Sequence, residues 1–369
     1  MIAKLEDLGD VRGKTVLVRT DFNVPMSGPD DDRIIVDDFR IRSALETLNW
    51  LTSRGANVVC ATHLGRPKGK KVAKYSIAPV RKRLAELAPG VSLLENLRFN
   101  EGEEGNDPNF VAKLVDGVDI YVNDAFGAAH RSHASIVGPP KTLPSAAGRL
   151  LHRELEVLTE LRSNPKRPFV AVLGGAKVSD KLGVIQALMK VVDQLIIGGG
   201  MCFSFLAAKN LPIGDSLCEL DQLDACRQLL SGDVPIYLPE DIVGLNKSGE
   251  FATFGVRLPD GAKGLDIGPG SAAAFADIIM NARSVFWNGP MGMFEDERFA
   301  AGTRTVAQAM ADTKAFTVVG GGDSAAALAQ FRLDKEVDHV STGGGASLEF
   351  LQLGDLPGLV ALRGAPNVK

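Results

Sequence analysis

The amino-acid sequence predicts an α/β protein built from two Rossmann-like domains with parallel sheets. Short runs rich in β-branched residues alternate with longer amphipathic segments, which is the pattern of βα units. Many of the 40 glycines stand in pairs or triplets directly after an apolar run, as at sharp strand-to-helix turns. The length of 369 residues is enough for about two domains of ordinary size.

The first half of the chain predicts four strands and two helices. The expected strands are Thr15–Arg19, Asn57–Ala61, Ser92–Leu94 and Asp119–Val122. The expected helices, Asp37–Ser53 and Ala78–Leu87, carry apolar residues at helical spacing. The basic and glycine-rich stretch 62–76 is expected to be a loop.

A domain boundary is expected near residues 163–168. Residues 147–161 form an amphipathic pattern, with Leu151, Leu155 and Leu158 on one face. The segment SNPKRP follows, and its two prolines end the helix. We therefore expect an N-terminal domain of residues 1–163, a C-terminal domain of residues 164–345 and a tail of residues 346–369.

The second half repeats one theme, an apolar strand that ends in glycine or proline. The six runs are FVAVLGG, QLIIGGG, PIYLPED, SVFWNGP, FTVVGGG and HVSTGGG. In open α/β sheets ligands bind at the carboxyl ends of the strands, so these turns predict a binding edge. A short helix, Ala346–Leu353, then ends at Gly354, and the rest of the tail is too short to fold alone.

Composition argues against several classes of protein. The chain carries 41 Lys and Arg against 45 Asp and Glu, and no strongly basic domain that would bind nucleic acid. Neither a secretory signal nor a run of 18 apolar residues is present, so no membrane association is expected. The four cysteines, which show no C-x-x-C pairing, predict reduced thiols in a cytoplasmic protein; they are Cys60, Cys202, Cys218 and Cys226.

The stretch Phe169 to Lys181 at the middle of the chain predicts an anion site. An apolar strand breaks at Gly174 and Gly175, and a helix start there would expose backbone N–H groups to a phosphate. Lys177 and Lys181 follow, four residues apart and so on one face of that helix. The alternative is a tight turn with two solvated lysines.

Polar and basic residues follow each strand of the first half. They are Arg19, Asp21 and Asn23 at the end of the first strand and beyond it, His63 and Arg66 after the second, Arg98 after the third, and Asn123, Asp124, His130, Arg131 and His133 after the fourth. Arg40 and Arg42 open the helix between the first two strands. If the strands are parallel, these groups meet at one edge and favour a small polyanion. The alternative is a set of surface arginines with no shared ligand.

Two acidic residues follow glycine-rich turns in the second half. Asp323 could cap the helix behind Gly320–Gly322 or reach a Mg²⁺ ion that bridges phosphates. Glu295 could accept hydrogen bonds from ribose hydroxyls or lie in solvent.

General nucleotide signatures are weak in this sequence. The P-loop pattern is absent, and G-x-G-x-x-A matches at Gly320–Ala325 and Gly268–Ala273 outside the usual first βαβ unit. A dehydrogenase therefore stays a minor alternative. No nucleophilic triad is evident, so positioning and charge stabilisation, as in phosphoryl transfer, are the expected chemistry.

The longer motifs together resemble one family. RTDFNVP, THLGRPKG, LLENLRF, YVNDAFGAAHRSHAS, LGGAKVSDK, IIGGGM, FWNGPMGMFE, VVGGGDS and VSTGGGASLE are similar, in order and spacing, to the signature segments of phosphoglycerate kinases. The resemblance implies two domains joined by a hinge helix, with the tail packing back on the N-terminal domain. It implies reversible phosphoryl transfer between 1,3-bisphosphoglycerate and ADP, giving 3-phosphoglycerate and ATP, with Mg²⁺, in a cytoplasmic monomer.

The resemblance also implies roles for individual residues. The acid substrate would be held by Asp21, Asn23, Arg40, His63, Arg66, Arg98 and Arg131. The nucleotide would contact Gly174, Gly175, Lys177, Lys181, Gly198, Gly199, Gly200, Asn288, Pro290, Glu295, Gly320, Gly321, Gly322, Asp323 and Ser324. Arg40, Lys177 and Lys181 would be catalytic, and Asp323 would serve the Mg²⁺.

Departures from the family pattern are few. Thr20 stands where valine is common, Ser324 replaces a frequent threonine, and the chain is short around residues 207–265. A non-catalytic binding protein with the same fold is a further alternative, but such a protein would be expected to lose Lys177 or Arg40.

Overall fold

The computed structural model describes residues 2–30 and 32–366, and the chain divides into two compact units. The first unit contains the chain up to Glu156 and again from Asp355, and the second runs from Val157 to Gly354. Helix α7 (Arg149–Ser163) continues across the division at residues 156 and 157. The boundaries expected from the sequence, at 163/164 and 345/346, remain predictions about where the functional domains meet.

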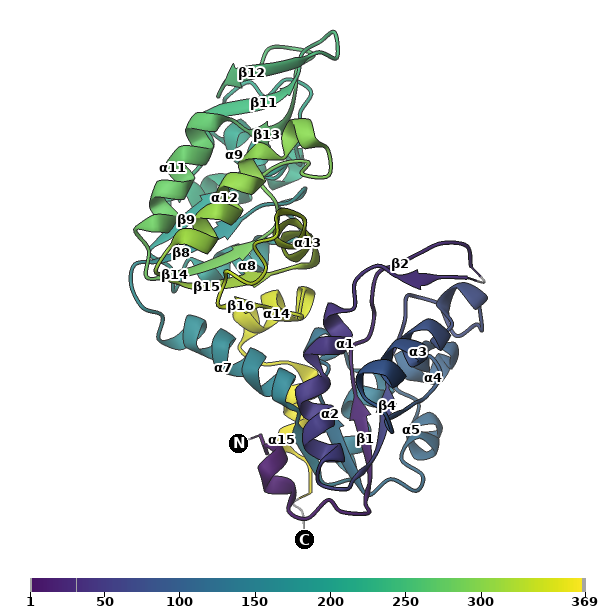
Figure 1. Ribbon diagram of the computed structural model, residues 1–369. Helices are drawn as coiled ribbons and strands as arrows, with labels where there is room; N and C mark the ends of the chain where they lie inside the picture. Colours follow the sequence, from purple (N-terminus) through teal and green to yellow (C-terminus); the bar gives the residue numbers. More distant parts are fainter. Residues whose placement is uncertain (1, 31, 367–369) are drawn as a thin grey trace. The chain divides into compact units, whose positions relative to one another are not determined.

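A five-stranded parallel sheet forms the centre of the first unit (Figure 1). Its strands, in spatial order, are β5 (Ser92–Leu93), β4 (Asn57–Ala61), β1 (Thr15–Arg19), β6 (Ile120–Asn123) and β7 (Ser145–Ala147). The four strands expected from the sequence are all present within one residue of their predicted starts. The edge strand β7 was missed because its Ser-Ala-Ala sequence has no β-branched or aromatic residue.

Alternate residues of the strands fill the core on one face of this sheet. Val16 and Val18 of β1 pack with Ile41 and Leu48, which come from the helices on that face. These helices are α1 (Phe39–Ser43), α2 (Leu45–Thr52) and α3 (Ala78–Leu87). The single helix expected over residues 37–53 is therefore two helices that meet at Ala44.

The remaining short elements of the first unit surround the sheet. They are α4 (Glu101–Glu104), α5 (Pro108–Leu114), α6 (Ala134–Val137), α15 (Pro357–Arg363), the hairpin β2 (Met26–Ser27) and β3 (Ile34–Ile35), and the 3-10 turns η1 (Leu5–Leu8), η2 (Ala73–Tyr75), η3 (Leu97–Phe99), η4 (Phe126–Ala128) and η5 (Pro139–Lys141). The expected loop 62–76 thus contains one short turn, η2.

A six-stranded parallel sheet forms the centre of the second unit. Its order is β10 (Ile236–Tyr237), β9 (Gln194–Ile197), β8 (Phe169–Leu173), β14 (Ser284–Asn288), β15 (Phe316–Gly320) and β16 (His339–Val340). These are the six strands predicted from the glycine-terminated runs, which confirms that prediction. Leu173, Asn288 and Gly320 are in register, so the glycine turns after β8, β14 and β15 share one edge.

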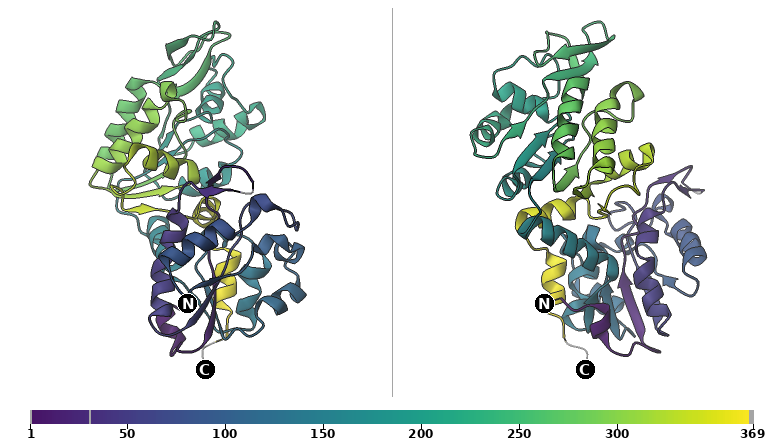
Figure 2. Two further views of the ribbon diagram at one scale, coloured as in Figure 1. Left: turned by 45° about the vertical axis from the view of Figure 1, so that its right-hand side comes forward. Right: turned by 60° about the vertical axis from the view of Figure 1, so that its left-hand side comes forward.

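Helices cover both faces of this sheet. Helices α11 (Pro269–Met280) and α12 (Ala301–Asp312) lie side by side (Figure 2), and with α13 (Gly322–Phe331) they bury Val170 and Trp287. The other face carries α8 (Leu182–Leu188), which packs against α14 (Gly345–Leu353), and α9 (Cys202–Ala208), which packs against α10 (Leu223–Leu230). Two short turns, η6 (Leu220–Gln222) and η7 (Glu297–Phe299), complete the unit.

A three-stranded antiparallel sheet in the second unit was not expected from the sequence. Its order is β12 (Phe251–Gly255), β11 (Asp241–Leu245) and β13 (Lys263–Ile267). The outer strand β12 has no buried residue, so its sequence shows no clear apolar face. It was therefore not distinguished from a loop.

The C-terminal tail returns to the first unit, as the sequence and the resemblance led us to expect. Gly354 ends α14 with a left-handed φ of 78°, which glycine adopts without strain. Helix α15 then contacts α6 and β7, and Leu359 and Leu362 are buried there. Among the described residues, no helix is long and apolar enough to cross a membrane.

Candidate active site

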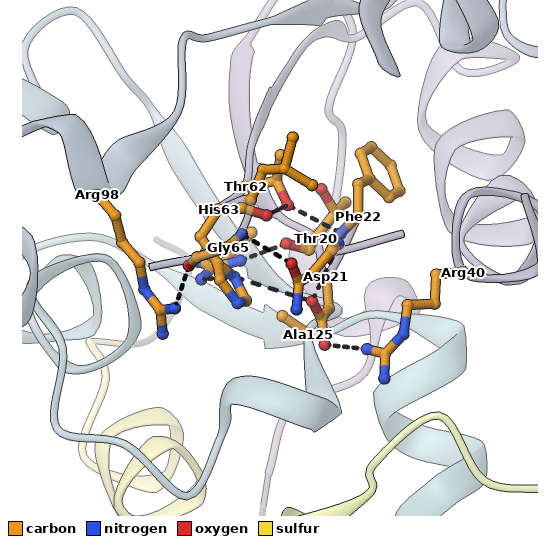
Figure 3. A network of polar contacts seen from close by, with 12 residues as sticks. Thr20, Asp21, Phe22, Arg40, Thr62, His63, Gly65, Arg98 and Ala125 are labelled. Carbon is orange, nitrogen blue, oxygen red and sulfur yellow. Dashed lines mark hydrogen bonds and ion pairs between the residues drawn. The ribbon is translucent and has the colours of Figure 1, made fainter. Parts of the chain in front are cut away.

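The strand ends of the first unit bring together a cluster of charged and imidazole side chains, shown in part in Figure 3. Asp21 follows β1, His63 follows β4, and Arg98 lies in η3. Asp21 accepts a hydrogen bond from Arg40, and its Oδ1 lies 3.8 Å from His63 Nδ1. Residues from four separate segments therefore meet at the carboxyl edge of one sheet, where a parallel sheet is expected to bind ligands.

Burial and the nearby arginines lower the pKa values of the imidazoles in this cluster. Burial lowers the pKa of His63 well below its usual value; the nearby charge of Asp21 opposes this shift, while Arg19 lowers the pKa further. Burial, with Arg98 second, also lowers the pKa of His133, to about 4. Burial alone would raise the pKa of Asp21, but Arg40 beside it brings this pKa below its usual range. The imidazoles are thus neutral at neutral pH, and the net positive charge of the arginines favours an anionic ligand.

Some of the predicted ligands also support the backbone of the site. Arg98 is buried, and its Nη1 donates to the Gly65 carbonyl at 2.7 Å. The side-chain oxygen of Asn23 accepts a hydrogen bond from Gly65 N at 2.9 Å. Arg66 is exposed beside this turn, Arg131 is half-buried, and the Arg40 side chain is 28% exposed. Arg66, Arg131 and Arg40 therefore reach solvent, whereas Arg98 is held by the protein.

Arg19 was expected to contribute a guanidinium to the ligand, and this expectation is wrong. The side chain is fully buried, and its nitrogens are engaged by Ser135, Thr20 and His63. The sequence could not show this, because the partners Ser135 and His63 lie 116 and 44 residues away in the chain.

In the second unit, the turns after the central strands line a cavity of about 650 Å³. Of the predicted nucleotide contacts, Gly175, Gly199, Gly200, Pro290, Glu295 and Asp323 line it. The other lining residues were missed; they are Ala176, Cys202, Phe203, Asp215, Ser216, Leu217, Cys218, Lys263, Gly264, Leu265, Asp266, Ile267, Met291, Gly292 and Met293. The glycine-rich turn WNGPMGMFE gave a signal for Met291–Met293, whereas the β13 residues belong to the sheet that was not foreseen.

Two of the glycines allow the turns to approach one another. A Cβ atom on Gly174 would lie 2.0 Å from the Pro290 carbonyl oxygen, and one on Gly199 would lie 2.5 Å from Gly175 N. Gly199 also has a φ of +63°. Any other residue at either position would force these backbone segments apart.

The two lysines of this region are not on one helix face, and that prediction is wrong. Helix α8 begins only at Leu182, because residues 178–181 form a turn closed by the hydrogen bond from Lys181 N to Val178 O. Lys177 is exposed and lies just before this turn. Lys181 Nζ instead donates to the carbonyls of Gly174, at 2.6 Å, and Asn288, at 2.8 Å.

The charge of Lys181 is perturbed by its position. Burial lowers its pKa to about 8, although the carboxylates of Asp323 and Asp180 oppose that shift. A Cβ atom on Gly175 would lie 3.5 Å from Nζ, so the amine is close to the cavity that Gly175 lines. An anion bound there would stabilise the charged form of this lysine.

Asn288 and Ser324 occupy the ends of the turns rather than the cavity wall. Asn288 is buried, and its Nδ2 has no hydrogen-bond partner among the described residues. The Nδ2 atom faces the Gly320–Gly322 turn, since a Cβ on Gly321 would lie 2.9 Å from it. Ser324 Oγ accepts a hydrogen bond from Gly289 N at 2.6 Å and is buried.

The residues present fit a Mg²⁺ ion that is bound mainly through phosphates. Asp323 is exposed at the cavity and makes no capping hydrogen bond to α13, so the alternative of a helix cap is wrong. Within the part of the chain that the structure describes, no three His, Cys, Asp or Glu side chains could together hold a metal. One carboxylate together with nucleotide phosphates and waters is a usual Mg²⁺ environment.

Comparisons with known proteins agree with the motifs. The family model described as phosphoglycerate kinase matches residues 5–92 and 88–353. The chain is 49% identical over 381 residues to a phosphoglycerate kinase of Rubrobacter xylanophilus, covering 96% of each chain, and 48% identical over 397 residues to one of a Parafrankia species, covering 97% of this chain and 99% of the relative.

Solved structures are similar over nearly the same extent. The structure of phosphoglycerate kinase from Coxiella burnetii aligns with a TM-score of 0.87 at 37% identity. That from Pyrococcus horikoshii OT3 aligns with a TM-score of 0.86 at 32% identity. In both cases the match covers 98% of this chain and 99% of the other.

Proposed function

The chain belongs to the phosphoglycerate kinase family, and we propose that its two candidate sites divide the substrates of that reaction between them. It is a glycolytic kinase that transfers a phosphoryl group between 1,3-bisphosphoglycerate and ADP, giving 3-phosphoglycerate and ATP. The main support for this division of the substrates is that the two sites differ in their chemistry. One is a cluster of arginines and neutral imidazoles, and the other is a glycine-lined cavity at the edge of a parallel sheet.

The phosphoglycerate is proposed to bind the first unit. Its ligands would be Asp21, Asn23, Arg40, His63, Arg66, Arg98 and Arg131. Arg40 and Arg66 are accessible to a carboxylate or phosphate, and Asp21 orients Arg40. Arg98 and Asn23 support the site by holding the Gly65 turn, in addition to any contact with substrate.

The nucleotide is proposed to bind the second unit. Backbone N–H groups near Gly199 and at the start of α13 would face its phosphates, and Glu295 would face the ribose. Asp323 would hold Mg²⁺, whose bound charge offsets that of the phosphate oxygens. Lys181 and Ser324 would act mainly by fixing the turns that surround the phosphates.

The transfer itself is proposed to be in-line, without a covalent enzyme intermediate. Lys177 and Arg40 would stabilise the charge on the moving phosphoryl group, since both reach solvent from their own units. With the substrates on different domains, residues 1–163 and 164–345, transfer requires closure, with α7 as the hinge element. Small-angle scattering should show compaction with both substrates present; unchanged scattering would contradict closure.

We further propose a cytoplasmic monomer. The four cysteines are free thiols, which is usual in a reducing compartment. Each proposed site is built from one copy of the chain. Sedimentation at assay concentration would test this, because a stable dimer would contradict it.

Two single substitutions test the division of substrates. Arg66→Ala should raise KM for 3-phosphoglycerate about tenfold while leaving KM for ATP within about twofold. Glu295→Ala should instead raise KM for ATP about tenfold while leaving KM for 3-phosphoglycerate within about twofold. The assignment would be wrong if either variant changed the two KM values equally.

A further inference from the structure

A buried chain of hydrogen bonds lies behind the basic cluster of the first unit. Arg19 Nε donates to Ser135 Oγ at 2.8 Å. Ser135 Oγ is 2.6 Å from Glu103 Oε1, and Ser135 N donates to Glu103 Oε2 at 2.9 Å. Arg19 and Glu103 are fully buried and Ser135 is 1% exposed, so a serine hydroxyl joins two opposite charges out of contact with water.

The protons of this chain can be placed without ambiguity. A guanidinium has only donors, so Ser135 Oγ must accept from Arg19. The single hydroxyl proton is then left for the Glu103 carboxylate, which accepts it. Tyr121 donates its hydroxyl to the Ser135 carbonyl at 2.7 Å, which fixes the serine backbone as well. The chain is fully satisfied and holds Arg19 in one orientation.

The other end of Arg19 contacts His63. Arg19 Nη2 lies 3.2 Å from His63 Nδ1, and because the guanidinium can only donate, Nδ1 must be the acceptor. Asp21 Oδ1 lies 3.8 Å from the same nitrogen and would favour a proton there. Arg19 thus opposes the protonation that Asp21 favours, and its orientation decides which nitrogen of His63 carries a proton.

We propose that Glu103 and Ser135 are positioning residues of the kinase reaction, which act through Arg19 to keep Nδ1 of His63 unprotonated and Nε2–H available to the phosphoglycerate. This proposal rests on the assignment of His63 to the phosphoglycerate site made above. A neutral imidazole that donates from Nε2 would keep the same hydrogen-bonding capacity throughout the physiological pH range.

The other charged groups that act on His63 agree with a neutral ring. The negative charge of Asp21 raises the pKa of His63, and the positive charges of Arg19, Arg98 and Arg131 lower it. Burial is the largest influence on the ring and also disfavours its charged form. Loss of the Arg19 contact would leave Asp21 as the nearest partner of Nδ1, so the pKa of His63 would rise toward its ordinary value.

Nitrogen NMR of the whole protein tests the proposal directly. The chain has five histidines, so ¹⁵N-histidine labelling gives a small set of ring signals, and His63→Gln identifies the one in question. In the wild type we expect His63 to show an unprotonated Nδ1 and a protonated Nε2 from about pH 5.5 to about pH 8. A protonated Nδ1 in the wild type would overturn the proposal, whatever the variants do.

Ser135→Ala removes the hydroxyl that holds Arg19. The pKa of His63 should then rise, and KM for 3-phosphoglycerate should rise roughly fivefold at neutral pH and depend on pH, while KM for ATP stays unchanged. Glu103→Gln should change the titration of His63 and KM for 3-phosphoglycerate in the same direction. It replaces Ser135→Ala as the test variant if Ser135→Ala folds poorly. The matched control is Ser132→Ala, an exposed serine in the same segment, which should change nothing.

The outcomes separate this proposal from the site assignment. If Ser135→Ala and Glu103→Gln fold but leave the His63 ring signals as in the wild type, the positioning role is wrong. If instead His63→Gln binds 3-phosphoglycerate as well as the wild type does, the assignment of His63 to the substrate is wrong, and the proposed role in the reaction fails with it.

Discussion

Lys177 and Lys181 belong to one sequence motif but differ in exposure and in hydrogen bonding. Lys177 is exposed, whereas Lys181 is half-buried and donates to two carbonyls at the ends of β8 and β14. The sequence predicted that both lysines lie beside the glycine turn, but it could not show that their environments differ. Their difference depends on a turn at residues 178–181, where a helix was expected.

Substitution of Lys177 tests its assigned contact with the moving phosphoryl group. Lys177→Ala should lower kcat about a hundredfold or more, because the lost charge acts mainly on the transition state. KM for ADP should change only a few-fold. Lys190→Ala, which removes another exposed lysine of the second unit, is the control. Steady-state kinetics with an unchanged kcat for Lys177→Ala would contradict the assignment.

The pKa of Lys181, about 8, predicts that nucleotide binding takes up a proton. In the free protein the amine becomes neutral as the pH rises through about 8, whereas bound phosphates favour its charged form and raise the pKa. Affinity for ADP should therefore be constant below that pH and fall between about pH 8 and about pH 10.

Calorimetry in two buffers of different ionisation enthalpy measures this uptake. The wild type should take up a fraction of a proton per ADP near pH 8.5, and Lys181→Met should lose that part of the uptake. Equal uptake by the two proteins would show that another group is responsible.

Asn288, Ser324 and Arg19 show the limit of residue-level prediction. Each was placed correctly near a strand end, but whether its side chain faces a ligand or the protein depends on contacts with distant segments. Ser324 holds Gly289, and Arg19 holds Ser135, which lies 116 residues away in the sequence. Hydrogen-bonded pairs of residues so far apart in the chain leave no pattern in the local sequence.

Among the elements, the buried parallel strands were the most predictable part of the fold. Runs such as Phe169–Leu173 are apolar throughout, since helices cover both faces of the sheet, and glycines mark their ends. Strand β7 and the outer strand β12 lacked these signals. The residues of β7 are small and those of β12 are at most half-buried, so no apolar period distinguishes these strands from loops.

The close approach of the glycine turns predicts a specific loss on substitution. Gly199→Ala would add a Cβ atom 2.5 Å from Gly175 N at a φ of +63°, so the turn must move. Affinity for ADP should fall at least about tenfold, because the turn lines the cavity. Calorimetric titration with ADP measures this loss.

Gly249→Ala is a matched control for this experiment. Its φ is +77°, but no atom lies within 4 Å of the added Cβ. It should cost about 1 kcal/mol of stability, as a left-handed alanine does, and leave ADP binding unchanged. Equal loss of ADP affinity in both variants would mean that backbone strain, not the close approach, is what matters.

At the scale of the whole molecule, the chain leaves its first unit once and returns to it at the end. Helix α15 buries Leu359 and Leu362, and Gly358 N donates to the Ala129 carbonyl at 2.9 Å. The sequence predicted that the tail would pack back, because it is too short to form a domain. The structure adds where the change of unit occurs, at residues 354 and 355.

The tail should therefore stabilise the first unit. Leu359→Ala, at a residue that is 1% exposed, should lower the free energy of unfolding of that unit by about 2–4 kcal/mol. Val360→Ala, at a neighbour that is 55% exposed, should change it by less than about 0.5 kcal/mol. Urea unfolding can be followed through Trp50 in the first unit and Trp287 in the second. A loss confined to the Trp287 signal would contradict this view of the tail.

An assay of the transfer itself tests the proposed kinase function most directly. With 1,3-bisphosphoglycerate, ADP and Mg²⁺, the purified chain should form ATP at a rate that requires all three, and chelation of the metal should abolish the rate. Lys177→Ala should be folded but nearly inactive in the same assay. If the folded wild-type protein formed no ATP from these substrates, the kinase function and the sites proposed for it would both be contradicted.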